Sequence, residues 1–460
     1  MRPSSMRFFN SARGTLRAVG AGAAVAALFA VAGCTSDLLT VPTPNVIAEG
    51  AIGGSLGVTT LRNGSMMDFI VAYSGTQDGF AVVSGNLGDE IQTTDNFADR
   101  FNTDGRNSDE LFGGAIITTY RQLQLARSGL TSAIEKWIAV KSTTTAVRDS
   151  LSEMYAIRGF TELAFGEGYC AGVPFSKVSA GGEFEYGDPL TTAQLFSRAS
   201  ATADSAIANA TTTTYRSLAA IGKARALLGQ GQFSQAALAV SAVPTAFRYT
   251  LNHSIATVRQ NNGLWTAMFL AGSRYTVGTN EGTNGIDYLV TPADPRVSWV
   301  GTTNVGFDGT SGSLPRQLKY TSQSAPFILA DGIEARLIEA EARLQGGTQA
   351  DRDAVFAQVN VLRATGLTTA IAPLVASPST QTAAVDMLFK ERAFWLWLTG
   401  HRLGDMRRLV RQYARTATTV FPVGNVRYRP GQTYGSDVNL VIPFTERNNP
   451  KFKGCLDRNP

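Results

Sequence analysis

The sequence is poor in the residues from which enzymes most often build catalytic and metal-binding sites. It holds two histidines and three cysteines among 460 residues. The HExxH, CxxC, P-loop and GxGxxG patterns are absent, which excludes the metal, redox and nucleotide sites that these spacings indicate. A GxSxG pattern occurs at residues 53–57, but no strand is predicted before it, as a nucleophile elbow requires. We therefore expect no catalytic residue, no metal ligand and no cofactor.

A large excess of charge of one sign is also lacking. The chain has 41 Lys and Arg against 36 Asp and Glu, and four of these arginines lie in the first 33 residues, which contain no acid. The remainder is nearly neutral and shows no basic stripe, so we do not expect a nucleic-acid partner. Hydrophobic residues at 44% and charged residues at 17% are typical of a globular protein with a sizeable core.

The start of the chain has the features of a bacterial export signal in the usual order. Arginines precede the apolar run "AVGAGAAVAALFAVAG", which is shorter and richer in alanine than a membrane span of about 20 residues. The run ends in Val-Ala-Gly-Cys and resembles a lipobox, in which the cysteine thiol receives diacylglycerol. We predict a signal peptide at 1–33, lipidation of Cys34, a lipidated tether at 34–55 and one domain at 56–460. A secretory signal followed by an incidental cysteine is the alternative.

Two cysteines remain if Cys34 carries a lipid. Exported proteins fold in an oxidising compartment, where two cysteines allow one bridge. A disulfide between Cys170 and Cys455 would join the middle of the chain to its C-terminus. Two unrelated buried thiols are the alternative.

Helical periodicity dominates the chain and predicts a mostly α fold. In "LAAIGKARALLGQGQFSQAALAVSAVP", from Leu218 to Pro244, small residues permit two helices to approach closely across the turn "GQGQF". This segment and the pair 324–364 resemble tetratricopeptide hairpins, so we expect a partial solenoid of such hairpins. The predicted helices are 56–73, 107–138, 144–166, 191–209, 214–229, 232–242, 324–345, 349–364, 379–399 and 401–414.

Three segments do not fit this helical pattern. Residues 245–323 are rich in Gly, Asn, Thr and aromatics, and we interpret them as an irregular insertion of loops and short strands. Residues 415–460 are a loop-rich C-terminal end. Residues 88–110 are acidic but lack the spacing of a calcium loop, so we expect a solvated loop there. We expect His253 to be a surface or loop residue.

The segment "ERAFWLWLTGHRLGDMRR" at 391–408 crowds charges around large aromatics. Buried charges next to aromatic rings need partners. We therefore predict a structural ion-pair network of Glu391, Arg392, Arg402 and Asp405, and a structural role for His401.

That segment resembles the C-terminal signature of the SusD/RagB-like family of outer-membrane nutrient-binding lipoproteins. Trp395 and Thr399 stand where the family usually has Glu. Further resemblances follow one another in the expected order along the chain: "SGNLGDE" at 84–90, "GVP" at 172–174, "DPRV" at 294–297, Lys319-Tyr320 and "IPFTERNNP" at 442–450. The signature residues that match are Glu391, Arg392, Leu396, Gly400, Arg402, Asp405 and Arg408.

The resemblance implies four tetratricopeptide-like helix pairs and an irregular, ligand-binding half. It implies a lipid-anchored protein on the outside of the outer membrane of a Gram-negative bacterium. There it would bind an oligosaccharide, or a peptide, without catalysis and pass it to a TonB-dependent β-barrel transporter. Since sugars stack their apolar faces on aromatic rings, we select four aromatic residues of the insertion as candidate ligand contacts. They are Trp265, Tyr275, Tyr288 and Trp299.

Two other functions remain open from the sequence. A lipid-anchored tetratricopeptide-type scaffold would bind only proteins, and an exported hydrolase would need a nucleophile or base. The aromatic insertion favours nutrient binding over the scaffold, and the missing catalytic motifs disfavour the hydrolase.

Overall fold

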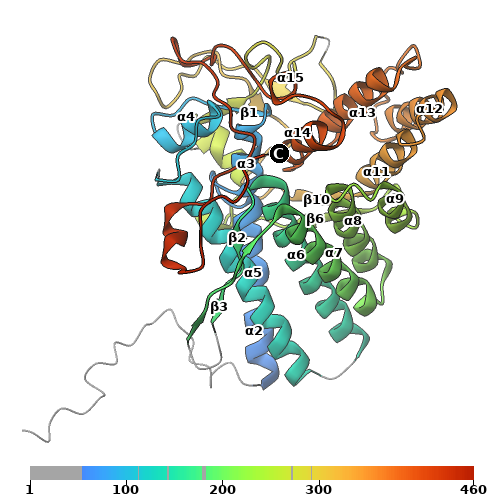
Figure 1. Ribbon diagram of the computed structural model, residues 1–460. Helices are drawn as coiled ribbons and strands as arrows, with labels where there is room; N and C mark the ends of the chain where they lie inside the picture. The colour runs from blue at the N-terminus through green and yellow to red at the C-terminus, as the bar shows by residue number, and fades with distance from the viewer. Residues whose placement is uncertain are drawn as a thin grey trace, which may run out of the picture. The chain divides into compact units, whose positions relative to one another are not determined.

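The computed structural model describes residues 54–459, except 112, 142–143, 179–182, 271–272 and 292 (Figure 1). The chain divides into a unit of residues 1–53 and a unit of residues 54–460. The predicted signal peptide, Cys34 and almost all of the predicted tether therefore lie outside the described residues. In the described part of the chain, no helix is both long and apolar enough to cross a membrane.

Antiparallel helix pairs form the helical half of the described unit (Figure 1). Four pairs pack as hairpins, α2 with α5, α6 with α7, α8 with α9 and α11 with α12. This confirms the expectation of a mostly α fold with tetratricopeptide-like hairpins. The helices are α2 Gly54–Ser74, α5 Ala115–Val140, α6 Thr145–Gly168, α7 Thr192–Asn209, α8 Thr213–Gly229, α9 Phe233–Val240, α11 Gly332–Leu344 and α12 Gln349–Thr365.

Small residues set the spacing of these helices, as the hairpin pattern predicted. A Cβ atom on Gly222 of α8 would lie 3.2 Å from the ring of Phe160 on α6, and one on Gly229 would meet the ring of Phe196 on α7 at 2.6 Å. The turn between α8 and α9 needs Gly231, whose φ of +73° falls in the left-handed region. Alanines and glycines at these crossings therefore let the aromatic rings fill the interior.

Some helix boundaries differ from the predicted ones. Residues 327–331 form strand β10, and α11 starts only after Asp331, whose carboxylate accepts a hydrogen bond from the Glu334 amide at 2.9 Å. The predicted helix 379–399 ends at Trp395, because Leu398 and Gly400 both have positive φ, +55° and +79°. The helix predicted at 107–138 starts at Ala115 and runs to Val140.

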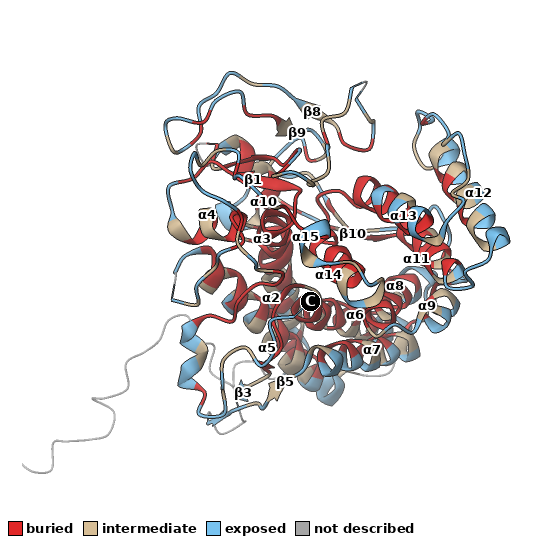
Figure 2. Cartoon of the chain, turned by 45° about the horizontal axis from the view of Figure 1, so that its top comes forward, coloured by how far each residue is buried: buried red, intermediate tan, exposed pale blue. Residues whose placement is uncertain are grey.

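Short strands and loops form the other half of the unit (Figures 1 and 2). Antiparallel pairs link β1 with β7, β6 with β10 and β8 with β9, and the first two pairs join segments that are distant in sequence. The strands of these pairs are β1 Ile91–Thr93, β6 Arg248–Leu251, β7 Tyr275–Val277, β8 Trp299–Val300, β9 Arg316–Gln317 and β10 Phe327–Asp331. The remaining strands are β2 Val173–Pro174, β3 Lys177–Val178, β4 Phe184–Glu185 and β5 Pro189–Leu190, paired as β2 with β5 and β3 with β4.

Further helices accompany these strands and bring the C-terminal signature into the core (Figure 2). Helix α14 contacts both α3 and α6. These helices are α3 Phe80–Leu87, α4 Ala98–Asp104, α10 Gly263–Trp265, α13 Gln381–Trp395, α14 Arg402–Gln412 and α15 Ala417–Val420. Single turns also lie at η3 Val258–Gln260, η4 Thr266–Leu270 and η5 Phe444–Asn448.

Candidate functional site

The signature segment contains a fully buried ion-pair triad. Arg392 donates to both carboxylate oxygens of Asp405 at 2.8 and 2.9 Å, and Arg408 donates to the same carboxylate at 2.7 Å. Burial alone would raise the pKa of Asp405, but the two guanidinium groups outweigh it and hold that pKa well below its usual range. The triad is therefore a charge-compensated structural element rather than a poised acid.

The other two members of the predicted network bond elsewhere, which corrects its expected connections. Glu391 accepts from Arg296 and from Arg363, each at 2.6 Å. Arg402 donates to both oxygens of Asp89 at 2.7 Å. The partners come from segments 28 to 313 residues away in sequence, so proximity in the chain could not identify them.

The acidic segment at 88–110 is not a solvated loop, and that prediction was wrong. It contains β1 and α4, and Asp89, Glu90 and Asp95 are fully buried. Glu90 accepts a hydrogen bond from the Leu398 amide at 2.8 Å, and burial raises the pKa of Glu90 to about 8. The acidic side chains of this segment are therefore part of the core, where Asp89 and Glu90 bond residues of the C-terminal signature.

Both histidines are buried and hydrogen-bonded. The His401 ring lies 2.8 Å from the hydroxyl of Thr399 and 3.0 Å from the carboxylate of Glu334. His253 lies in a loop, as predicted, but it is buried rather than on the surface, and burial lowers its pKa to about 4. Its ring nitrogens contact the Ser74 hydroxyl and the Gln260 carbonyl at 3.1 Å each. Neither imidazole is presented to solvent as a catalytic base would be.

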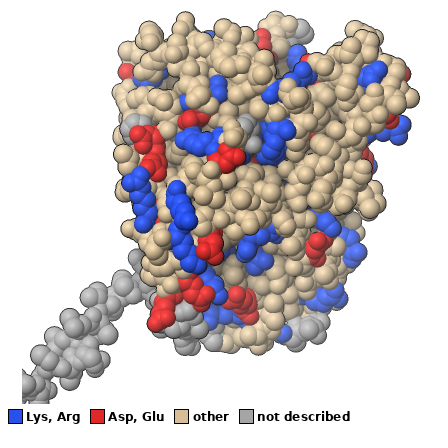
Figure 3. Space-filling view, in the orientation of Figure 1, with Lys and Arg blue, Asp and Glu red and all other residues tan. Residues whose placement is uncertain are grey.

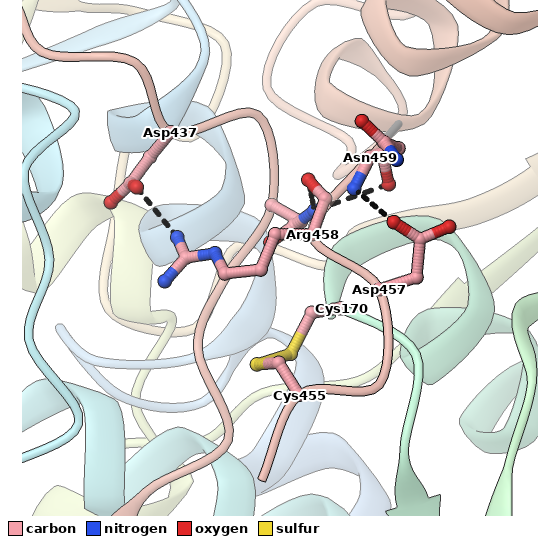
Figure 4. Close-up of a disulfide and its surroundings, with 7 residues drawn as sticks. Cys170, Asp437, Cys455, Asp457, Arg458 and Asn459 are labelled. Carbon is pink, nitrogen blue, oxygen red and sulfur yellow. Dashed lines mark hydrogen bonds and ion pairs between the residues drawn. A yellow bond between two sulfur atoms is a disulfide. The ribbon is translucent and has the colours of Figure 1, made fainter.

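A disulfide joins Cys170, just after α6, to Cys455 in the C-terminal tail (Figure 4). The tail is also held by a backbone bridge between Ala171 and Asp457, and Arg458 bonds Asp437 at 2.6 Å. The disulfide and the backbone bridge therefore both hold the C-terminal tail against the middle of the chain.

The structure divides the four candidate aromatic residues into two groups. Tyr275 and Tyr288 are fully buried, and the Tyr288 hydroxyl lies 3.3 Å from Asp89, so neither ring has a surface to offer a ligand. Trp265 and Trp299 are half-buried, and Trp265 stacks on Phe269 with ring centroids 5.5 Å apart. The enrichment of aromatics among polar loop residues did not distinguish rings that anchor the loops from rings that face solvent.

Two exposed phenylalanines form a better platform for a ligand. Phe97, before α4, is 50% exposed and Phe307, between β8 and β9, is 40% exposed, and their ring centroids are 6.1 Å apart. The Arg274 guanidinium lies 3.6 Å from the Phe307 centroid and donates to Asp95 at 2.6 Å. We call Phe97 and Phe307 the ring pair, an apolar surface fixed by a buried ion pair and bordered by cationic donors.

A cavity of about 830 Å³ lies between the C-terminal end of α2, helix α5 and the insertion. Asp78 lines it and receives two hydrogen bonds of 2.9 Å from Arg100, whose guanidinium lies 5.5 Å from the centre of the Phe97 ring. We call it the α2–α5 cavity, after two helices that contribute to its wall. Its lining comprises Val71, Gly75, Thr76, Gln77 and Asp78, then Thr118, Arg121, Gln122 and Leu125 of α5, and Val258, Arg259 and Thr266 of the insertion.

Charge does not gather into a single-sign field on the face shown in Figure 3, where acidic and basic side chains alternate among uncharged ones. In the described residues, no group of three or more His, Cys, Asp or Glu side chains is arranged to hold a metal ion. The arrangement of rings, guanidinium groups and a partly apolar cavity suits a polar ligand with apolar faces.

Comparison with solved structures identifies the fold formed by these helices and loops. A SusD-like carbohydrate binding protein from Bacteroides vulgatus superposes with a TM-score of 0.61 over 89% of this chain and 98% of its own, at 16% identity. A SusD superfamily protein from Bacteroides thetaiotaomicron gives 0.63 over 87% and 99% of the two chains, at 12% identity. One from Parabacteroides distasonis gives 0.63 over 87% and 98%, also at 12% identity. The chain has the SusD fold.

The SusD fold confirms the resemblance read from the sequence motifs and accounts for their positions. The motif at 84–90 supplies Asp89 to Arg402 of the signature, and Lys319 donates to the Trp397 carbonyl within the signature. Motifs spread over more than 300 residues thus meet in one part of the SusD core. No family model matches the chain, and no curated protein matches it either.

Sequence analysis missed both members of the ring pair on this SusD scaffold. Phe97 lies in the acidic segment that was predicted to be a solvated loop. Phe307 stands in "VGFDGTSG", where Gly, Asp and Ser predict a turn. Tyr288 stands in the similarly polar segment "TNGIDY" and is buried, so no local sequence signal separates the exposed ring from the buried one.

Proposed function

We propose that this protein binds an oligosaccharide without transforming it. The observation that carries the proposal is the exposed ring pair, whose surface can stack on the apolar face of a sugar while Arg274 and its neighbours bond hydroxyl groups. Similar solved structures include a SusD-like carbohydrate binding protein, which supports this class of ligand. Both histidines are engaged in buried contacts, so the proposal assigns no catalytic residue.

We also propose that the protein works as a surface lipoprotein. Lipid on Cys34 would anchor it to the outer membrane of a Gram-negative bacterium, facing outward, and a TonB-dependent β-barrel transporter would receive the ligand. The order of arginines, apolar run, small residues and cysteine at 1–34 supports the anchor. The family that the sequence motifs and the SusD fold indicate supports the transporter.

Binding should be tested by calorimetric titration of the domain 56–460 with a panel of purified oligosaccharides and peptides. We expect at least one oligosaccharide to bind, and we expect Phe97→Ala combined with Phe307→Ala to weaken it about 10-fold or more. Val375→Ala, which removes another exposed apolar side chain on a distant loop, serves as the matched control and should change nothing. Binding that is confined to peptides, or that ignores the ring pair, would contradict the proposal.

The anchor and the partner need the full-length protein in its native membrane. Gentle detergent extraction followed by mass spectrometry should recover a stoichiometric TonB-dependent barrel, and Cys34→Ala should release the protein from the membrane fraction. Recovery of soluble or periplasmic proteins alone would favour a protein-binding scaffold instead.

A further inference from the structure

One ion pair, between Arg100 and Asp78, contacts both the ring pair and the α2–α5 cavity. Arg100 lies against the Phe97 ring at 5.5 Å and bonds Asp78 in the cavity wall at 2.9 Å. Arg100 is buried and Asp78 half-buried, so the pair forms a fixed partition between the two surfaces. Because this ion pair separates the two surfaces, a ligand that contacts both needs more than one sugar unit.

The cavity carries one positive charge without a counter-ion. Among its charged residues, Asp78 is neutralised by Arg100, and Arg259 forms an ion pair with Asp68. Arg121 is exposed on α5, and within the described residues no ion pair or side-chain hydrogen bond engages it. An unpaired guanidinium at a cavity offers a fork of donors that matches a carboxylate.

The groups beside Arg121 suit the rest of an acidic sugar. The side-chain oxygens of Gln77 and Gln122 lie in the cavity wall without a hydrogen-bond donor, so a rotation of either amide would let it accept from a ligand hydroxyl. Leu125 and Val258 are exposed apolar side chains of the same cavity, and they suit the carbon face of a sugar ring. The α2–α5 cavity therefore combines two hydrogen-bond acceptors, two apolar side chains and the Arg121 guanidinium.

We propose that the ligand is an acidic oligosaccharide, one unit of which rests on the ring pair while the carboxylate of another unit binds Arg121 in the α2–α5 cavity. This inference rests on the proposed function and goes beyond it by naming the charge and the minimum length of the ligand. The second cavity, of about 510 Å³, holds an exposed cation too, Lys390. It serves as a control because, in the part of the chain that the structure describes, no ion pair links it to the ring pair.

The test uses the domain 56–460 and matched ligands. Hexasaccharides and monosaccharides of galacturonate, glucuronate and mannuronate are titrated calorimetrically beside the same sugars with their carboxyl groups reduced to alcohols. We expect at least one acidic hexasaccharide to bind about 10-fold or more tightly than its reduced form. We also expect its affinity to fall as salt rises, and the monosaccharides to bind far more weakly.

Variants then separate the two surfaces. Arg121→Gln should remove the preference for the acidic form and leave the affinity for the reduced form within about twofold, and Arg121→Lys should restore part of it. Lys390→Gln, which removes the same charge at the second cavity, should leave the preference intact. Phe97→Ala should weaken the acidic and the reduced form alike.

The outcomes distinguish this inference from the function on which it rests. If neutral and reduced oligosaccharides bind as tightly as the acidic forms, the inference of an acidic ligand is wrong. It is also wrong if the preference for the acidic form survives Arg121→Gln. In both cases the proposed function still stands. Loss of the preference in Lys390→Gln moves the site to the second cavity and equally overturns the inference. Binding of no oligosaccharide at all overturns both.

Discussion

The signature segment at 391–408 and the insertion at 245–323 use aromatic and charged residues in opposite ways. In the signature, rings and charges are buried together, and every guanidinium of the triad is matched by a carboxylate. Beside the insertion, the ring pair is left exposed and only its supporting ion pair is buried. The same residue types therefore hold the fold together in one region and are available to a ligand in the other.

The difference lies in what each region packs against. Helices α13 and α14 face the interior, and the charges that they bury are paired with carboxylates or, for Arg407, bonded to backbone carbonyls. The loops between β8 and β9 lie at the edge of the unit (Figure 2), where a ring can remain in contact with water. Substitutions in the first region should therefore change stability, and substitutions in the second should change binding.

The largest effect is expected for Asp405→Asn. It leaves Arg392 and Arg408 buried with only Glu341 as a carboxylate partner, and we expect it to lower the free energy of unfolding by about 3–5 kcal/mol. Urea unfolding followed by circular dichroism measures this loss. Asp386→Asn breaks the exposed pair with Arg415 and should cost less than about 1 kcal/mol. Equal losses in the two variants would show that burial does not set the strength of these pairs.

The disulfide should rank next. Replacing Cys170 and Cys455 by serine removes a link across 285 residues, and we expect the free energy of unfolding to fall by about 2–4 kcal/mol. Ligand affinity should stay within about twofold, because the bond lies in the tail region and not at the ring pair. Unfolding curves and thiol counts of the denatured domain check this, and two free thiols in the wild-type protein would refute it.

A pH-dependent loss of stability is expected from Glu90. Its pKa of about 8 in the folded protein lies above its ordinary value of 4.5, so the folded protein keeps a proton that the unfolded chain has already released. Stability should therefore fall as pH rises from about 4.5 to about 8, by at most about 1.4 kcal/mol per pH unit from this group.

Glu90→Gln isolates that contribution. The amide oxygen can still accept from Leu398, so the variant should unfold with a flatter pH dependence and gain stability over the wild type near pH 8. Urea unfolding at pH 5, 6.5 and 8 compares the two proteins, whose other buried charges, such as Asp89 and Arg402, are unchanged. Parallel pH profiles would mean that Glu90 is ionised in the folded protein.

The smallest effect on stability, with a clear effect on binding, is expected for Phe307→Ala. Since its ring is 40% exposed, we expect a change within about 0.5 kcal/mol in unfolding. We expect about a fivefold weaker affinity for the bound oligosaccharide, or about 1 kcal/mol. Tyr288→Phe is the converse control in the buried region and should lower stability by about 1 kcal/mol without changing affinity. A reversal of these two outcomes would break the contrast between the regions.

Prediction from the sequence succeeded where a local pattern determines the structure. The hairpin of α8 and α9 followed from spacing and small residues alone, because its contacts are between neighbours in sequence. Strand β10 was missed because its apolar run "FILA" continues into the pattern of α11, and only its pairing with β6 makes it a strand. Buried Asp89 was missed for a related reason, since its partner Arg402 lies 313 residues away.

The ring pair shows the same limit at the candidate site. Phe97 and Phe307 are 210 positions apart in the sequence, and only the fold brings them within 6.1 Å. Each ring alone is indistinguishable by composition from Tyr275, which the same fold places in the core. Exposure, which decides whether an aromatic residue can meet a ligand, is a property of the assembled structure.

The bond between Asp89 and Arg402 has a consequence for the order of folding. As the chain is synthesised, Asp89 emerges first, and more than 300 residues follow before its counter-ion does. Until then the carboxylate stays hydrated, and the segment around α3 lacks the partner that makes its burial favourable. Completion of this part of the core therefore waits for nearly the whole polypeptide, so it cannot form progressively from the N-terminus.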